Sequence, residues 1–82
     1  MTTYILMTNE READDIASNS KTFVFRDERY NFRIGDEISF QVIKAGRKVF
    51  HDIERMRFIV SYVTDRAPLE SGYKAVGFRR AI

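Results

Sequence analysis

The chain contains no cysteine, only one histidine and only one proline. Without cysteine it can form neither a disulfide nor a thiolate metal site, which fits a reducing cytoplasm. A single histidine, His51, leaves no zinc cluster and no Cys/His catalysis. The sequence also has no P-loop and no dinucleotide-binding glycine pattern. These absences predict a protein that uses neither a metal nor a cofactor.

Long apolar runs are missing too. The longest, residues 4–7, is far shorter than the roughly 20 residues that cross a bilayer, and it lacks the basic flank of a signal peptide. We therefore expect a protein that is neither membrane-embedded nor exported. The 82 residues predict a single domain, 1–82, with one modest core. The hydrophobic share of 44% is sufficient for a folded globule and too high for a disordered chain.

Charge is small overall and unevenly spread. The net charge is +2, but residues 1–43 hold 5 Lys/Arg and 8 Asp/Glu, whereas residues 44–82 hold 9 and 4. A basic half can attract phosphates. The alternative is that these cations only solvate exposed strand faces. The arginines concerned are Arg55, Arg57, Arg79 and Arg80.

The stretch at residues 21–40, KTFVFRDERYNFRIGDEISF, organises the chain. It predicts a strand at 21–26, a charged and aromatic turn at 27–31, and a second strand at 37–43. Between them, Gly35 predicts a tight corner that needs positive φ or a close backbone approach. Asp36 is expected to accept backbone N–H bonds in that turn.

The flanking sequence predicts the remaining elements. Residues 3–7 read as a strand, and Thr8 or Asn9 can cap a helix over 9–19 with a thin apolar stripe. Gly46 suits a hairpin turn at 45–48. Residues 53–64 predict a long strand, with a helix at 52–58 as the alternative, and a loop at 65–72 precedes a last strand at 73–79.

Strand alternation gives a predicted core. In 37–43, for example, the apolar positions alternate with Glu37, Ser39 and Gln41. The residues expected to be largely buried are Phe23, Phe25, Ile34, Ile38, Phe40, Val42, Phe58, Val60 and Val76.

Cationic and aromatic side chains around the first half of the central stretch are candidate ligand contacts. Lys21 offers a point charge, and Arg26 can fork onto a phosphate or a base edge. Tyr30 can stack on a base. Each has an intramolecular alternative: Lys21 capping helix carbonyls, Arg26 pairing with an aspartate, and Tyr30 packing on Phe32. A Ser-His-Asp triad would need His51 at its centre, and a solvated histidine is the simpler interpretation.

Residues 20–26 and 32–36 resemble the ASCH domains of the PUA-like superfamily, particularly a short branch found in bacteria and their phages. Residues 72–78 resemble the closing strand of that branch. The resemblance implies an α+β fold: a small β-barrel of five or six strands with one main helix near the N-terminus. It also implies a cleft that receives RNA, a nucleoside or a modified base. The side chains that contact the ligand would then be Lys21, Thr22, Arg26 and Tyr30. The resemblance also implies a location in the cytoplasm of a bacterium or of an infected cell.

Some small ASCH proteins hydrolyse an acylated cytidine with a lysine, a threonine three residues later and a distant glutamate. Lys21 matches that lysine, but Val24 occupies the threonine position and has no hydroxyl. Thr22 should point to the opposite strand face. Three functions therefore remain. The first is a nucleic-acid or nucleotide binding module, the second is a related hydrolase or nuclease, and the third is a phage protein that binds and inhibits a host protein.

Overall fold

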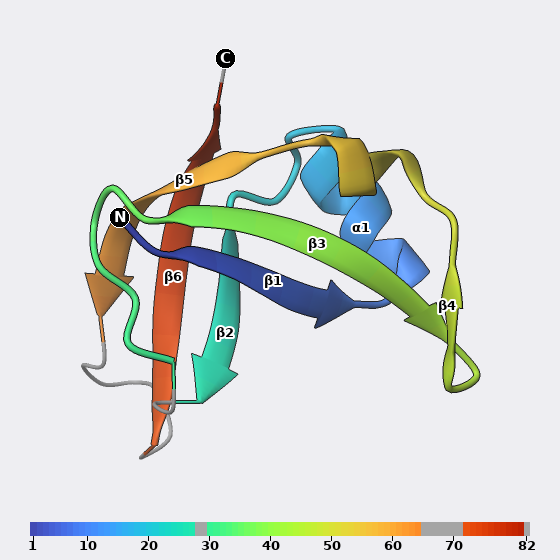
Figure 1. The fold of residues 1–82 in the computed structure, drawn as a ribbon, viewed down its shortest axis with the longest axis horizontal. Helices are drawn as coiled ribbons and strands as arrows, with labels where there is room; N and C mark the ends of the chain where they lie inside the picture. The colour runs from blue at the N-terminus through green and yellow to red at the C-terminus, as the bar shows by residue number, and fades with distance from the viewer. Residues whose placement is uncertain (28–29, 65–71, 82) are drawn as a thin grey trace.

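The structure, a computed structural model, describes residues 1–27, 30–64 and 72–81. Within them, one α-helix, one short 3-10 helix and six strands follow one another along the chain (Figure 1). The elements are β1 (Thr3–Thr8), α1 (Glu10–Ala17), β2 (Phe23–Asp27), β3 (Glu37–Lys44), β4 (Arg47–Val49), η1 (Asp52–Arg55), β5 (Phe58–Thr64) and β6 (Tyr73–Arg80).

The strands form one mixed sheet in the order β1-β3-β5-β6-β2, and β4 pairs with β3. β1 and β3 are parallel, because the chain passes through α1 and β2 before it returns, and the other pairs are antiparallel. The α+β class with one N-terminal helix is confirmed. The backbone ladder ends at β1 and at β2, so the described sheet is not closed into a barrel.

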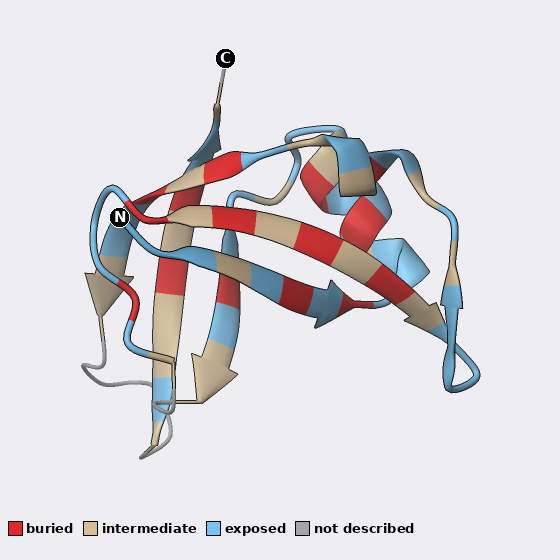
Figure 2. Ribbon diagram, in the orientation of Figure 1, coloured by how far each residue is buried: buried red, intermediate tan, exposed pale blue. Residues whose placement is uncertain are grey.

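The core lies where the two halves of this curved sheet cross. In Figure 1, β1 and β3 run across β2 and β6, and α1 packs against β3 and η1. Phe40, Phe58 and Phe78 meet with ring centroids 5.1–5.7 Å apart. Buried positions alternate along β3 (Figure 2), as its sequence predicts. Burial is confirmed for Ile38, Phe40, Val42, Phe58, Val60 and Val76.

The predicted orientation of β2 is wrong. Phe23 and Phe25 are 44% and 50% exposed, whereas Val24 is fully buried. The cause is register: among the described residues β2 pairs only with β6, and Val24 lies opposite Val76, which is itself fully buried. Since side chains alternate along a strand, both phenylalanines must then face outward.

Ile34 is also not a core residue, since it is 72% exposed. Its predicted place is taken by Phe32, which is 4% exposed and packs on Tyr4 with ring centroids 4.6 Å apart. Ile34 instead leads into the corner at Gly35, where φ is +96°. Only a residue without Cβ adopts this conformation at little cost.

Asp36 fixes this corner as predicted. It is 6% exposed, its Oδ1 accepts from the Thr2 N–H at 3.1 Å, and its Oδ2 accepts from the Arg33 N–H at 3.0 Å. The hairpin turn at Gly46, with φ of +78°, is likewise present between β3 and β4.

The long strand predicted at 53–64 is shorter. His51 caps the 3-10 helix η1, and Ile53 on that helix is fully buried. The helical alternative therefore holds for the first residues, and β5 begins at Phe58. α1 is shorter than predicted, with Asn9 as its N-cap, and β2 starts two residues later. Most of the loop predicted at 65–72, and residues 28–29 of the charged turn, lie outside the described residues.

Candidate nucleic-acid interface

The polar corner where α1 begins is built around Glu12. Asn9 caps the helix by accepting a hydrogen bond from the Glu12 N–H at 2.8 Å. The Oε2 atom of Glu12 lies 2.8 Å from Lys21 Nζ. Its Oε1 atom accepts from the Thr8 hydroxyl at 2.6 Å and lies 3.8 Å from Arg26 Nη2. We call these residues the Glu12 cluster: Thr8, Glu12, Lys21 and Arg26.

The electrostatics of the Glu12 cluster favour an ionised carboxylate. Burial alone would raise the pKa of Glu12. Hydrogen bonds from Lys21 and Thr8, together with the positive charges of Lys21 and Arg26, outweigh burial and lower the pKa below its ordinary value. The three charged side chains are only 19–27% exposed. Two cations and one anion leave the cluster with a net positive charge at neutral pH.

Arg26 also fastens the two edges of the sheet together. Its guanidinium donates to the Met7 carbonyl of β1 at 2.9 Å and to the Phe25 carbonyl at 2.7 Å. Because β1 and β2 are the edge strands, this side chain links edges that no backbone ladder joins. Arg26 therefore has an intramolecular role, but its carboxylate partner here is Glu12, while Asp36, a predicted partner, accepts from the Thr2 and Arg33 N–H groups.

Lys21 borders an exposed aromatic surface. Its Nζ lies 5.5 Å from the centroid of the Phe23 ring, and the rings of Phe23 and Phe25 meet edge to face at 5.6 Å. The backbone N–H of Lys21 also caps α1 by donating to the Asp15 carbonyl at 3.1 Å. The ammonium thus sits between a carboxylate and an aromatic ring that faces solvent.

The other predicted ligand contacts lie apart from this corner. Tyr30 follows β2 whereas Lys21 precedes it, so the length of β2, about 17 Å, separates them. The Tyr30 ring stacks on Phe32 with centroids 5.3 Å apart, which is the packing alternative. Thr22 is exposed, and its carbonyl accepts from the Phe78 N–H at 2.9 Å. The structure therefore brings together Lys21 and Arg26 but not Tyr30.

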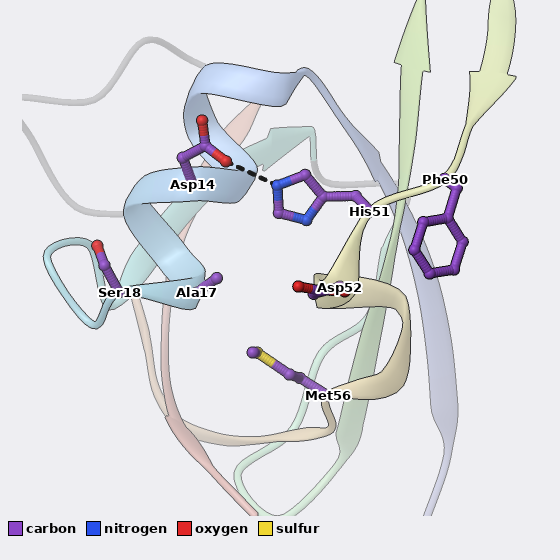
Figure 3. Close-up of a pocket in the computed structure, with 7 residues that line it drawn as sticks. All are labelled: Asp14, Ala17, Ser18, Phe50, His51, Asp52 and Met56. Atoms are coloured by element: carbon purple, nitrogen blue, oxygen red, sulfur yellow. Dashed lines mark hydrogen bonds and ion pairs between the residues drawn. The ribbon is translucent and has the colours of Figure 1, made fainter.

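His51 lines a separate open hollow of about 590 Å³ (Figure 3). Its Nδ1 accepts from the Ile53 N–H at 3.0 Å, so Nε2 carries the proton that is donated to Asp14 Oδ1 at 2.7 Å. Both ring nitrogens are occupied, and Ser18, which also lines the hollow, donates its hydroxyl hydrogen bond to the Asp15 carbonyl. This arrangement ties η1 to α1 and does not form a triad.

The arginines of the predicted basic surface have different surroundings, and Arg57 lies beside the end of β6, where its carbonyl accepts from the Ala81 N–H at 2.8 Å. Arg57 pairs with Glu37 at 3.0 Å, and Arg55 lies over the Phe50 ring at 5.5 Å from its centroid. Arg79 is exposed and pairs by register with Ile59 on the outer face of the sheet. Arg80 is exposed and follows it at the end of β6.

Sequence reasoning missed Glu12 and Thr8. A signal was available, because Asn9 and Glu12 have the spacing of a capping box. That signal predicts a helix start and does not reveal that the carboxylate turns toward β2. The exposed aromatic face was missed because its phenylalanines were assigned to the core.

No protein-family model matches the chain, and a search of curated proteins finds no match either. Among the described residues, no helix has the length and apolar character needed to span a membrane. The same residues contain no group of three or more His, Asp or Glu side chains arranged to hold a metal ion.

Proposed function

We propose that this chain is a small nucleic-acid-binding module of the ASCH type within the PUA-like superfamily, and that it receives an RNA segment or a nucleoside beside β2. One observation carries the proposal: the Lys21 ammonium is held 2.8 Å from Glu12 and 5.5 Å from an exposed aromatic ring. A cation next to an open ring offers both a phosphate contact and a stacking surface.

The Glu12 cluster supports this function by its charge. Glu12 orients Lys21 but does not neutralise the corner, because Arg26 supplies a second positive charge. Arg26 is fixed by two backbone carbonyls, so its guanidinium loses little side-chain freedom when an anion approaches. In the ASCH domains that the sequence resembles, the part of the strand that corresponds to Lys21 and Arg26 faces the ligand cleft.

The test is a titration of labelled single-stranded RNA and of nucleosides at several salt concentrations. Phosphate contacts require the logarithm of affinity to fall with the logarithm of salt concentration. Lys21→Ala should weaken RNA binding about tenfold, the typical loss for one charge-assisted contact. Lys48→Ala is the matched control, because Lys48 also pairs with a glutamate, Glu54 at 3.4 Å, on the distant β4. If the protein binds no nucleic acid at low salt, this proposal is wrong and binding of a host protein becomes the favoured function.

A second candidate, hydrolysis of an acylated nucleoside, is favoured by one contact. The position that holds the nucleophile in the related hydrolases is Val24, which is fully buried. Thr8, which is itself only 8% exposed, places a hydroxyl 2.6 Å from the Glu12 carboxylate, beside Lys21. A carboxylate in contact with a hydroxyl can act as its base. The lowered pKa of Glu12 makes it a weak one.

This second candidate is tested with acylated cytidine as substrate. Turnover by the wild type that disappears in Thr8→Val would support it, since valine keeps the shape of threonine and removes the hydroxyl. Turnover that survives in Thr8→Val would exclude Thr8 as the nucleophile. Thr22→Val is the control, because Thr22 is an exposed residue immediately before β2.

A further inference from the structure

The outer face of β2, β6 and β5 has aromatic borders and a floor of small residues. Gly77 of β6 pairs with Phe23 on one side and with Tyr62 on the other. In the next row, Ala75 pairs with Phe25 and with Thr64. Directly paired residues in an antiparallel ladder point to the same face. Figure 1 shows β6 running between β5 and β2, so these two rows lie side by side across three strands.

The aromatic side chains of this outer face are open to solvent. Phe23, Phe25, Tyr62 and Tyr73 are 44–59% exposed, although each lies in a strand. Tyr62 directly follows a register shift in the pairing of β5 with β6. The opposite face of the same strands is closed, since Val24, Val76 and Phe78 are at most 4% exposed. Large exposed side chains gathered on one face, and not scattered singly, mark an interaction surface.

The small residues Gly77 and Ala75 leave a strip on this surface that is wide enough for the flat ring of a base. Neighbouring strands lie about 4.8 Å apart, so the backbones carrying Phe23 and Tyr62 are about 10 Å apart across Gly77. Stacked bases are separated by about 3.4 Å. The Tyr62 Cβ lies close to Gly77, since a Cβ placed on the glycine would be 3.2 Å from it. The Phe23 and Tyr62 side chains remain about half exposed, so one base fits against either ring. A second base fits above Ala75 beside Phe25.

Charge on the outer face selects the occupant. Lys21 lies over Phe23 at one border, and Arg79 continues the Gly77 side of β6 toward the same end. Asp27 pairs with Tyr73 at the opposite end. A chain of phosphates is therefore attracted to the Lys21–Arg79 end, while its bases can lie on the aromatic rows. A neutral peptide or lipid would gain nothing from this charge arrangement.

We propose that the outer face of β2, β6 and β5 binds single-stranded nucleic acid by stacking two successive unpaired bases, one on the Phe23–Gly77–Tyr62 row and one on the Phe25–Ala75 row. This inference rests on the proposed function and adds the strandedness of its ligand. A duplex cannot use the surface, because its bases already stack on one another and hide their ring faces. The same stacking tolerates any base, since every base has a π-face.

The experiment compares a short single-stranded RNA with a blunt duplex of the same sequence, by fluorescence anisotropy at low salt. The wild type should bind the single strand at least tenfold more tightly. Phe23→Ala and Tyr62→Ala should each weaken single-strand binding about 5- to 150-fold, the range for loss of one stacked base. Phe50→Ala is the matched control: Phe50 is 71% exposed and contacts an arginine, but lies beside η1. This control should leave affinity unchanged.

One further variant and a check of folding keep the result interpretable. Phe23→Leu retains bulk and removes the aromatic ring, so it should fold like the wild type and still bind weakly. Circular dichroism and melting temperature verify that each variant is folded. Equal binding of single strand and duplex, with Lys21→Ala still weakening both, would overturn the stacking inference and leave the proposed function standing. Unchanged affinity in both Phe23→Ala and Tyr62→Ala would also overturn the inference. No binding of either RNA would overturn both proposals.

Discussion

The two faces of β2 differ in burial although both carry apolar residues. Phe23, Val24 and Phe25 are all apolar, yet the valine is fully buried and the two larger phenylalanines are about half exposed. On the inner face, Val24 pairs with Val76, and both belong to the same buried core as Phe40, Phe58 and Phe78. On the outer face, the phenylalanines flank the small residues Gly77 and Ala75. Size and hydrophobicity therefore did not decide burial, and the partner strand did.

The two faces of the sheet have different roles, the inner one in stability and the outer one in the proposed binding. The inner face contributes buried apolar area and should control folding. The outer face contributes little to the core and leaves aromatic rings available for a ligand. If that division is correct, inner-face variants should lose stability and outer-face variants should lose binding.

The largest expected effect is on the core that the inner face covers. Phe40→Ala should lower the free energy of unfolding by about 3–5 kcal/mol, because Phe40 is 1% exposed and contacts two other core rings. A domain of this size has a total stability of about 4–12 kcal/mol, so the variant can be largely unfolded. Phe25→Ala is the matched outer-face control and should cost about 1 kcal/mol or less. Urea denaturation measures the free energy of unfolding of both variants. Equal losses would show that the outer face stabilises the fold as much as the core does.

Val24→Thr tests the inner face of β2 itself. Threonine has the shape of valine but buries a hydroxyl, which costs about 1–3 kcal/mol without a partner. Thr22→Val, the reverse change at an exposed neighbour, should stay within about 0.5 kcal/mol. Melting temperatures measure the two effects. We also expect Val24→Thr to create no hydrolysis of acylated cytidine, since its side chain faces the core, and rapid turnover would show that the position is accessible.

Glu12→Gln should have a smaller, pH-dependent effect. The pKa of Glu12 is lowered in the folded protein, so its ionised form stabilises the fold. That contribution, about 1 kcal/mol, is complete above the ordinary glutamate pKa and is lost as pH falls through the lowered one. The melting temperature of the variant should therefore lie below that of the wild type at pH 7, and the difference should shrink in acid.

Glu10→Gln is the control for this pH series. Glu10 pairs with Lys44 at 3.1 Å, but both side chains are about half exposed or more, so the pair should contribute less. A melting-temperature difference for Glu12→Gln that is constant from pH 7 to acid would contradict the ionised role of Glu12.

The smallest effect is expected for Arg79→Ala, at the border of the outer face. Arg79 is exposed, so the free energy of unfolding should change by less than about 0.5 kcal/mol. Loss of one phosphate contact should reduce the salt dependence of single-strand binding by about 0.7 in slope. A large loss of affinity with the slope unchanged would indicate a contact other than phosphate.

The sequence predicted features that depend on local chemistry. The alternation in β3 was unambiguous because polar residues separate Ile38, Phe40 and Val42, so only one face could be buried. Gly35, Gly46 and Asp36 were assigned correctly, since positive φ and short-range backbone bonding are properties of a few consecutive residues. The sequence left the N-cap open between Thr8 and Asn9, and the structure places it at Asn9.

Tertiary structure decided what these local rules leave open. Both faces of β2 carry apolar residues, so only its register with β6 determined which face is buried. Glu12 precedes Lys21 by nine positions and Arg26 by fourteen, and only the return of the chain beside α1 brings their charges together. The Tyr62–Gly77–Phe23 row joins residues from three strands, and pairing between distant segments has no signature in any one of them. The sequence therefore determined the elements and their corners, while long-range strand pairing determined the core face, the Glu12 cluster and the aromatic surface.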